Sequence, residues 1–351
     1  MKIKPMTKFA ILALSLVLVA CAGGGSEEAG CPAIDGREIN VVATTPMIGE
    51  FVSQVGGENI NLTVLMPPEA NPHTYEPAPQ DAGTIAEADL VFYTGLLYEP
   101  AALVKLLENS ACSTDILSEV GESVFPIEFK EGGHDDHDDH DDEEGHDDHD
   151  DEEGHDDEEG HDDEEGHDDH EGHNHGAYDP HFWFDPSRVA YAAEYIESRL
   201  IQFDPENESS YTSSADSFVS ELNDLTKQVS ELISTVPSQN RKLITTHESL
   251  GYLEAKFGLE VLSTIIPSLN SANEISPSDL AGVIDVIEDN NVKVIFIESE
   301  APSVYSETIV AETGIKPVTG LYVETLKPGQ SYSEFLISNV KLITENLQDT
   351  D

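Results

Sequence analysis

Hydrophobic positions in the first third of the chain form short runs separated by longer mixed segments. Residues 37–45, 60–66 and 90–95 are rich in Val, Ile and Leu, and turn-forming residues lie between them, so strands are predicted there. Residues 79–89 and 100–109 are predicted to be helices. Strands of this kind that alternate with helices indicate a parallel sheet covered by helices on both faces.

The same alternation returns after residue 241. Strands are predicted at 242–246, 259–265, 292–299 and 316–322, and helices at 248–258, 276–291, 306–314 and 332–347. This second set of strands and helices predicts a second α/β lobe.

A long polar segment with one apolar stripe separates the two regions. Its apolar residues follow one another at spacings of four, three, four and three: Phe218, Leu222, Leu225, Val229 and Leu232. That period predicts a single amphipathic helix over residues 206–236. The predicted fold class is therefore α/β, with two lobes at 37–205 and 237–351 that contain parallel sheets flanked by helices and are joined by one long backbone helix.

The N-terminus has the pattern of a secretory signal over residues 1–20. Three lysines precede a hydrophobic run of 12 residues, which is too short to span a bilayer as a helix. The following Leu-Val-Ala-Cys resembles the lipobox of exported lipoproteins, which implies that Cys21 becomes the lipidated first residue. An incidental cysteine after an ordinary signal peptide is the alternative. Residues 21–36 then act as a flexible tether.

The charge and the cysteine content limit the classes of binding partner and the cellular compartment that fit this chain. The net charge is −55, and the 25 acidic residues at positions 134–175 leave −30 for the rest, which argues against binding to nucleic acid or to an anionic membrane surface. Contact with the membrane is expected only through the lipid anchor, on the outer face of the cytoplasmic membrane. If Cys21 carries lipid, two thiols remain outside the cytoplasm, and we predict a disulfide between Cys31 and Cys112.

The insert at residues 131–177 is predicted to be a disordered loop, because it is almost free of apolar residues that a core needs. The hexad His-Asp-Asp-Glu-Glu-Gly occurs four times within it. Its histidines are predicted weak metal sites: His134, His137, His140, His146, His149, His155, His161, His167, His170, His173 and His175. Rapidly exchanging capture of cations is the predicted role, and a solvated linker is the alternative.

Only three histidines lie outside the insert, and each occupies a loop at the end of a predicted strand or before a predicted helix. These are His73, His181 and His247. Ligands in open α/β sheets bind beyond the carboxyl ends of strands, and three imidazoles are a usual zinc complement. We therefore predict a metal site. Asp179, Asp185, Glu248 and the tyrosines near them are candidates to orient its imidazole rings.

Four motifs, in order, resemble those of the solute-binding proteins that serve zinc and manganese ABC transporters, the zinc-binding and lipoprotein-receptor-antigen family. They are NPHTYEPAPQD (71–81), DPHFWFDP (179–186), THESLGYLEAKFGL (246–259) and GLYVETL (320–326). The resemblance implies that His73, His181, His247 and Glu324 bind the transported metal, with water or another carboxylate as the alternative to Glu324. It also implies a permease with a cytoplasmic ATPase as partner.

The resemblance and the donor types together favour Zn(II) as the transported ligand. Manganese members typically have a carboxylate where this chain has His247, and manganese prefers more oxygen ligands than zinc. Zinc members commonly carry a His- and acid-rich loop at the position of the insert. Delivery of manganese or iron is one alternative, and a surface metal-storage protein or adhesin is another.

An enzyme is not expected. Zinc hydrolases usually present the local signature His-Glu-x-x-His, and His-Glu-Ser-Leu-Gly at 247–251 lacks the second histidine. The protein is expected to be a monomer.

Overall fold

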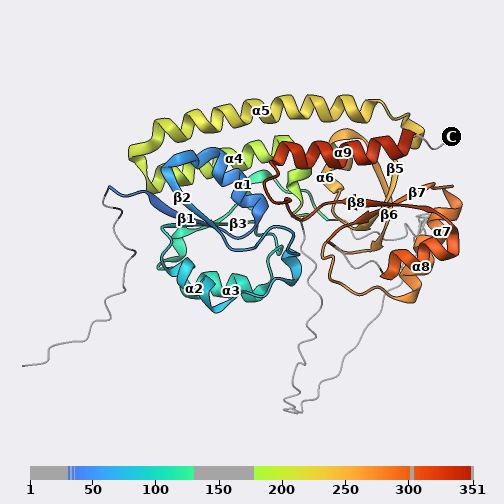
Figure 1. The fold of residues 1–351 in the computed structure, drawn as a ribbon, viewed down its shortest axis with the longest axis horizontal. Coiled ribbons are helices and arrows are strands. Elements are labelled where there is room, and N and C mark those ends of the chain that lie inside the picture. The colour runs from blue at the N-terminus through green and yellow to red at the C-terminus, as the bar shows by residue number, and fades with distance from the viewer. Residues whose placement is uncertain (1–30, 32–33, 35, 130–177, 301–303, 349–351) are drawn as a thin grey trace, which may run out of the picture.

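The structure is a computed structural model that describes residues 31, 34, 36–129, 178–300 and 304–348 (Figure 1). The signal segment, Cys21 and all the histidines of the insert lie outside these residues. None of the described helices combines the length and apolar content that a membrane crossing requires.

The N-terminal lobe is built on a four-stranded parallel sheet. Its strands are β1 (Ile39–Ala43), β2 (Ile60–Val64), β3 (Leu90–Tyr93) and β4 (Leu117–Glu119), in the order β2-β1-β3-β4. Successive side chains of β1 point to opposite faces, so Val41 packs in the core beneath the long helix and Val42 packs in a second core on the other face. Helices on both faces of this sheet cover these two cores, as the apolar strands predict.

Four helices flank this sheet: α1 (Pro46–Gly56), α2 (Pro79–Ala86), α3 (Ala101–Ser110) and α4 (Pro186–Phe203). In Figure 1, α1 and α4 lie on one side of the sheet, and α2 and α3 lie on the other. The sequence pattern gave no element for residues 46–56, where α1 begins at Pro46 after Thr45, whose hydroxyl accepts from the amide of Ile48. Two glycines within α1 weaken its intrinsic helix signal, whereas its buried apolar face stabilises it against the sheet.

The C-terminal lobe contains two parallel strand pairs that lie next to each other. The strands are β5 (Lys242–His247), β6 (Glu260–Ile266), β7 (Val294–Glu298) and β8 (Lys316–Leu321). Strand β5 lies beside β7. The helices are α6 (Gly251–Phe257), α7 (Pro277–Asp289), α8 (Val304–Thr313) and α9 (Tyr332–Gln348). The predicted order of elements after residue 241 is therefore confirmed, and so is the α/β fold class.

The long helix is α5 (Glu208–Ser234), which runs along one side of the molecule above both lobes (Figure 1). Its buried residues include Phe218, Leu222, Leu225 and Val229, as the spacing predicts. At its end Ile233 is fully buried and Leu232 is only partly buried, because the straight helix turns its apolar face by a small angle over each heptad. The exact limits of the two lobes stay predictions.

Helix α5 is not the only rigid connection between the lobes. Helix α9 packs against α5, and its Tyr332 hydroxyl donates to the carbonyl of Trp183, 2.7 Å away. The rings of Phe335 and Phe184 pack with their centroids 5.7 Å apart. One continuous hydrophobic core thus includes residues of both lobes, which fixes the lobes relative to each other where their strand ends meet.

Two further features of the described chain concern its surface and its start. Cys31 and Cys112 form a disulfide, which joins the segment before β1 to the end of α3.

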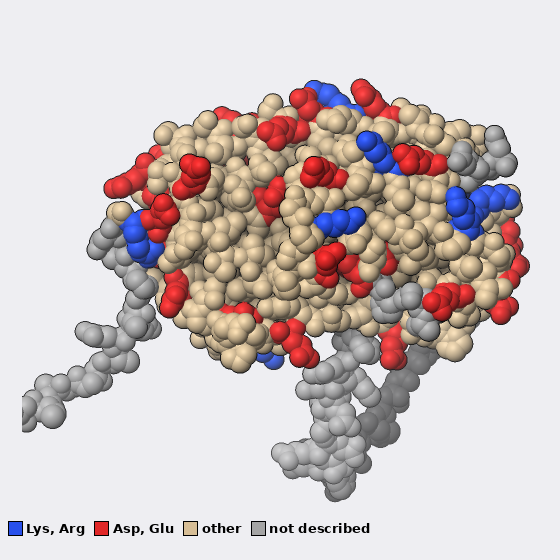
Figure 2. Space-filling view, in the orientation of Figure 1, with Lys and Arg blue, Asp and Glu red and all other residues tan. Residues whose placement is uncertain are grey.

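Figure 2 shows Asp and Glu side chains spread over the visible face, with Lys and Arg fewer and separate from one another. On this face of the folded chain, acidic side chains therefore outnumber basic ones, as they do in the sequence.

Candidate metal centre

The three histidines and Glu324 come together between the lobes. His73 lies in a short 3-10 segment (Pro72–Thr74) after β2, and His181 directly precedes another (Phe182–Phe184) that leads into α4. His247 is the last residue of β5, and Glu324 follows β8. The His73 side chain is 3% exposed, and those of the other three are fully buried.

The side chains converge on the Glu324 carboxylate. Its Oε1 lies 3.0 Å from Nε2 of His73 and 3.0 Å from Nε2 of His247, and its Oε2 lies 3.5 Å from Nε2 of His181. One donor atom from each of the four residues lies within 4.8 Å of the other three. The groups that sequence analysis singled out, scattered over 252 positions (73 to 324), therefore form one compact, buried cluster.

His73 is held through its backbone by the preceding asparagine. The Asn71 side chain accepts from the His73 amide (2.9 Å) and caps the short turn, while Pro72 restricts the backbone within it. The amide nitrogen of the same side chain donates to Ser271 Oγ (3.0 Å) and to the carbonyl of Glu300 (3.3 Å). Asn71 thus attaches the His73 turn of the first lobe to the second lobe.

His181 and His247 are each oriented by a carboxylate. Asp179 Oδ1 accepts from both the amide and the Nδ1 of His181, at 2.8 Å each. Glu298, the last residue of β7, accepts from the His247 amide (3.1 Å) and pairs with its Nδ1. When Nδ1 carries the proton and donates it to a carboxylate, Nε2 keeps its lone pair for a metal. This tautomer directs both Nε2 atoms into the cluster.

Of the three carboxylates that were predicted to orient an imidazole ring, one does so. Asp179 orients His181 as predicted. Asp185 instead caps α4 by accepting from the Ser187 amide (2.8 Å), and Glu248 accepts from Thr264 Oγ1 (3.0 Å), so in the described part of the chain neither carboxylate bonds a histidine ring. Glu298 has no signal in the sequence, because it is one acid among many and approaches His247 only when β7 lies beside β5.

Tyr98 is a further residue of the centre that sequence reasoning missed. Its hydroxyl donates to Glu324 Oε2 (3.0 Å), and its ring packs edge-on against those of His73 and His181. It follows three residues with positive φ, namely Gly95, Leu96 and Leu97. This uncommon backbone turns Tyr98 inward, away from the exposed Leu97.

Burial and neighbouring charges shift the pKa values of these groups in opposite directions. Burial alone would raise the pKa of Glu324, but His73, His247 and His181 hold that pKa well below its usual range. Burial alone would lower the pKa of His181, but Asp179 and Glu324 raise that pKa to about 9. For His247, burial is likewise outweighed by Glu298 and Glu324, so its pKa is well above the usual value. The carboxylate is therefore ionised at neutral pH.

Two buried nitrogens of the centre have no hydrogen-bond partner in the described part of the chain. They are Nε2 of His181 and Nε2 of His247, whose short approaches to Glu324 lack the angles of a hydrogen bond. Leaving buried polar atoms without partners costs about 1–3 kcal/mol each. Three imidazole nitrogens and an ionised carboxylate directed at one point suit a divalent cation such as zinc.

Comparisons with known proteins show which proteins the chain is similar to. A family model described as zinc-uptake complex component A, periplasmic, matches residues 41–346. The chain is 27% identical over 349 residues to the high-affinity zinc uptake system protein ZnuA of Bacillus subtilis, covering 97% of this chain and 96% of that protein. It is 22% identical over 335 residues to the manganese-binding lipoprotein MntA of Halalkalibacterium halodurans, covering 95% and 94%.

Solved structures share the fold. The periplasmic zinc-binding protein TroA from Treponema pallidum superposes with a TM-score of 0.70 at 20% identity, covering 88% of this chain and 99% of that one. The Fe(III)-bound YtgA from Chlamydia trachomatis superposes with a TM-score of 0.69 at 24% identity, covering 88% and 98%. At these identities the likeness concerns the fold, two lobes with parallel sheets and a long helix.

Proposed function

Because the chain belongs to the family of periplasmic zinc-uptake component A and is a metal-binding solute-binding protein of ABC transporters, we propose that its cargo is one Zn(II) ion. The ion binds His73, His181, His247 and Glu324 between the lobes and is delivered to a membrane permease powered by a cytoplasmic ATPase. The observation that carries this proposal is the convergence of three imidazoles on one buried, ionised carboxylate.

The donor set supports zinc over harder cations. At zinc–ligand distances of 2.0–2.2 Å, the donor atoms of a tetrahedral site lie about 3.4 Å apart. The three short nitrogen–oxygen distances here, 3.0, 3.0 and 3.5 Å, are close to that separation, and one donor atom from each of the four residues lies within 4.8 Å of the others. Manganese prefers more oxygen donors than the one carboxylate in this cluster.

The insert and the N-terminus extend the proposal beyond the described residues. The acidic, histidine-rich insert captures zinc weakly and raises its local concentration near the centre, to which the chain returns at Tyr178, three residues before His181. The lipid on Cys21 holds the protein outside the cytoplasm, close to the permease. Lipoprotein relatives such as PsaA of Streptococcus anginosus, 25% identical over 354 residues, support this location.

A competitive zinc titration of the mature chain tests the proposed ligands. The wild-type protein is expected to bind one ion tightly, and His73→Ala and Glu324→Ala are expected to weaken that site roughly 100-fold or more, because each removes one of four ligands. Metal content is measured by mass spectrometry. Glu248→Gln is the matched control, since Glu248 is next to His247 in sequence but bonds Thr264 outside the cluster.

Removal of residues 134–175 separates the centre from the insert. The tight site is expected to persist in this variant, with a native circular dichroism spectrum as the check on folding, while the weak sites disappear. If the tight site disappears with the insert in a folded protein, the four-residue centre is not the cargo site. If many ions remain tightly bound to the intact chain, storage rather than delivery is indicated.

Manganese is the second candidate cargo, because several relatives, including PsaA of Streptococcus mitis (25% identical over 350 residues), are named for manganese. Competition at equal free-ion concentration is a one-sided test of this alternative, because sites with nitrogen and oxygen donors generally bind zinc more tightly than manganese. Zinc is expected to displace manganese, and retention of manganese would assign the chain to the manganese members.

A further inference from the structure

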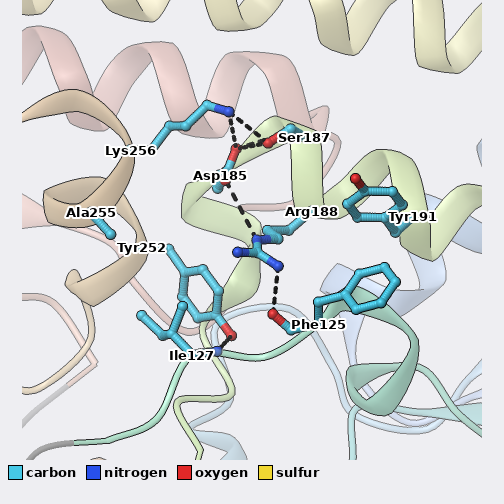
Figure 3. Close-up of a pocket in the computed structure, with 9 residues that line it drawn as sticks. All are labelled: Phe125, Ile127, Asp185, Ser187, Arg188, Tyr191, Tyr252, Ala255 and Lys256. Atoms are coloured by element: carbon cyan, nitrogen blue, oxygen red, sulfur yellow. Dashed lines mark hydrogen bonds and ion pairs between the residues drawn. The ribbon is translucent and has the colours of Figure 1, made fainter.

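A pocket of about 480 Å³ opens beside the metal centre, between α4 and α6. Figure 3 shows its wall: Lys256 and Tyr252 come from α6, Asp185, Ser187, Arg188 and Tyr191 come from the start of α4, and Phe125 and Ile127 come from the segment before the insert. Both lobes therefore contribute to one pocket, separate from the buried metal cluster.

The pocket is a cationic place on an acidic protein. Lys256 donates to Ser187 Oγ (2.8 Å), and Arg188 donates to the carbonyl of Val124 (2.8 Å), while one acid, Asp185, lies 3.7 Å from the lysine and 3.8 Å from the arginine. Asp185 also caps α4, whose N-terminal end carries positive partial charge. Among the residues that line the pocket, two cations and a helix end face one carboxylate, and this positive excess of the lining favours an acidic ligand.

Two aromatic rings beside these cations are exposed. Phe125 is 67% exposed and Tyr191 is 42% exposed, and their rings pack edge-to-face with centroids 5.1 Å apart. Imidazole rings can pack against aromatic rings in the same geometry, as His73 does against Tyr98 in the metal centre. The wall thus offers aromatic surface for a histidine together with cations for carboxylates.

The insert leaves and re-enters the described chain at this pocket. Ile127 lines the pocket, the undescribed residues begin at 130, and Glu128 and Tyr178 form an antiparallel bridge. The Tyr252 hydroxyl, in the pocket wall, accepts from the Ile127 amide (3.2 Å) and donates to the carbonyl of Asp179 (2.8 Å). One tyrosine therefore binds both roots of the insert, and Asp179 in turn orients His181.

We propose that this pocket docks one acidic His-Asp-Asp-Glu-Glu-Gly repeat of the chain's own insert. Carboxylates of the repeat pair with Arg188 and Lys256, and its imidazole packs on Phe125 and Tyr191. The first intact hexad begins at residue 140, 13 residues after Ile127, and an extended chain of that length spans about 40 Å, so the repeat reaches the pocket easily. Tethering also gives the repeat an effective concentration in the millimolar range.

Docking places metal-capturing side chains next to the peptide that carries His181. Its use for metal transfer rests on the proposed function, whereas docking itself does not and is measured without metal. A failed docking test therefore leaves the four-residue centre unaffected.

Carbodiimide cross-linking of the full mature chain in chelator tests the proposal. The reagent joins a lysine amine to a contacting carboxylate, and digestion followed by mass spectrometry identifies the pair. We expect Lys256 to be joined to Asp or Glu of residues 134–175, with a yield that falls severalfold between low salt and 1 M salt, where the Debye length is about 3 Å.

Pocket variants separate docking from chance encounters of a tethered segment. Arg188→Gln and Tyr191→Ser are expected to lower the Lys256 cross-link severalfold. Arg199→Gln is the matched control, because Arg199 also lies on α4 and also donates to a backbone carbonyl, that of Asp115, away from the pocket. Equal yields in all three variants would mean that Lys256 meets the insert only through its tether, and the proposal would be wrong.

A mixture of isotope-labelled and unlabelled chains identifies the occupant. Cross-links within one chain support the proposal. Mixed-mass cross-links would show that a second copy occupies the pocket, and Lys256 joined only to Asp185 would show that no repeat docks; either result overturns it.

Discussion

His247 and His73 approach the centre from opposite lobes and are held in different ways. His247 ends a central strand, and the buried Glu298 bonds both its amide and its ring. His73 lies on a short turn that Asn71 fixes through the backbone, and Asn71 itself bonds the other lobe. The C-terminal ligand is thus positioned within its own lobe, whereas the position of the N-terminal ligand depends on contact between the lobes.

The largest difference is expected in the stability of the metal-free protein. His247→Ala leaves Glu298, 2% exposed, without its imidazole partner, and removal of one partner from a buried ion pair costs about 3–5 kcal/mol. His73→Ala leaves Glu324 in contact with two other imidazoles, so a cost of about 1–2 kcal/mol is expected. Urea unfolding of both variants in the presence of a chelator measures their free energies of unfolding. Equal losses of stability would contradict the difference between the two histidines.

Substitutions of the residues that position the ligands extend the comparison to metal affinity. Asp179→Asn and Glu298→Gln are expected to weaken zinc binding roughly 10–100-fold, the usual effect of removing a carboxylate that orients a ligand. Asn71→Ala is expected to weaken zinc binding less than tenfold, because it acts on the backbone of His73 and not on its ring. A larger loss with Asn71→Ala than with Glu298→Gln would contradict the conclusion that His247, and not His73, is positioned within its own lobe.

The pH dependence follows from the raised pKa of His181. Burial lowers this pKa, but Asp179 and Glu324 outweigh it and raise it from 6.5 to about 9 in the metal-free protein. The proton stabilises the metal-free fold fully below about pH 6.5, and that stability is lost as pH rises through 9. Metal must displace the same proton, so His181 alone is expected to make zinc affinity rise about tenfold per pH unit below pH 9, and the raised pKa of His247 adds to this slope.

Asp179→Asn provides the control for this titration. Without the carboxylate, the rise in zinc affinity is expected to end at a lower pH. An unchanged profile, measured with a pH-insensitive competitor, would show that another group supplies the proton.

The smallest effect is expected at Tyr98, which connects the first lobe to Glu324. Tyr98→Phe removes one hydrogen bond to the carboxylate and keeps the ring packed between two imidazoles. A three- to tenfold loss of zinc affinity is expected, since such a bond contributes roughly 1 kcal/mol net. A loss as large as that of Glu324→Ala would mean that Tyr98 holds the carboxylate in place by itself.

Local pattern explains which parts of the fold could be predicted. Strand β7 lies in the most strand-like run of the sequence and helix α5 has a strong apolar period, and both are where the sequence predicts them. Helix α1, with two glycines, and the three-residue strand β4 have weak local signals and are stabilised by packing against the sheet. These short elements depend on long-range contacts that no local window contains.

By itself the sequence determined the alternation of strands and helices, the long amphipathic helix, and the three histidines at a strand end or before a helix, whereas Glu324 was singled out by the resemblance of its motif to a known family. It did so because periodicity and residue chemistry are local properties. Only the tertiary structure decided that Glu298 pairs with His247, that Tyr98 reaches Glu324, and that α9 joins the lobes. Each of these contacts joins residues at least 51 positions apart, and burial between packed elements, not local pattern, selects the partner.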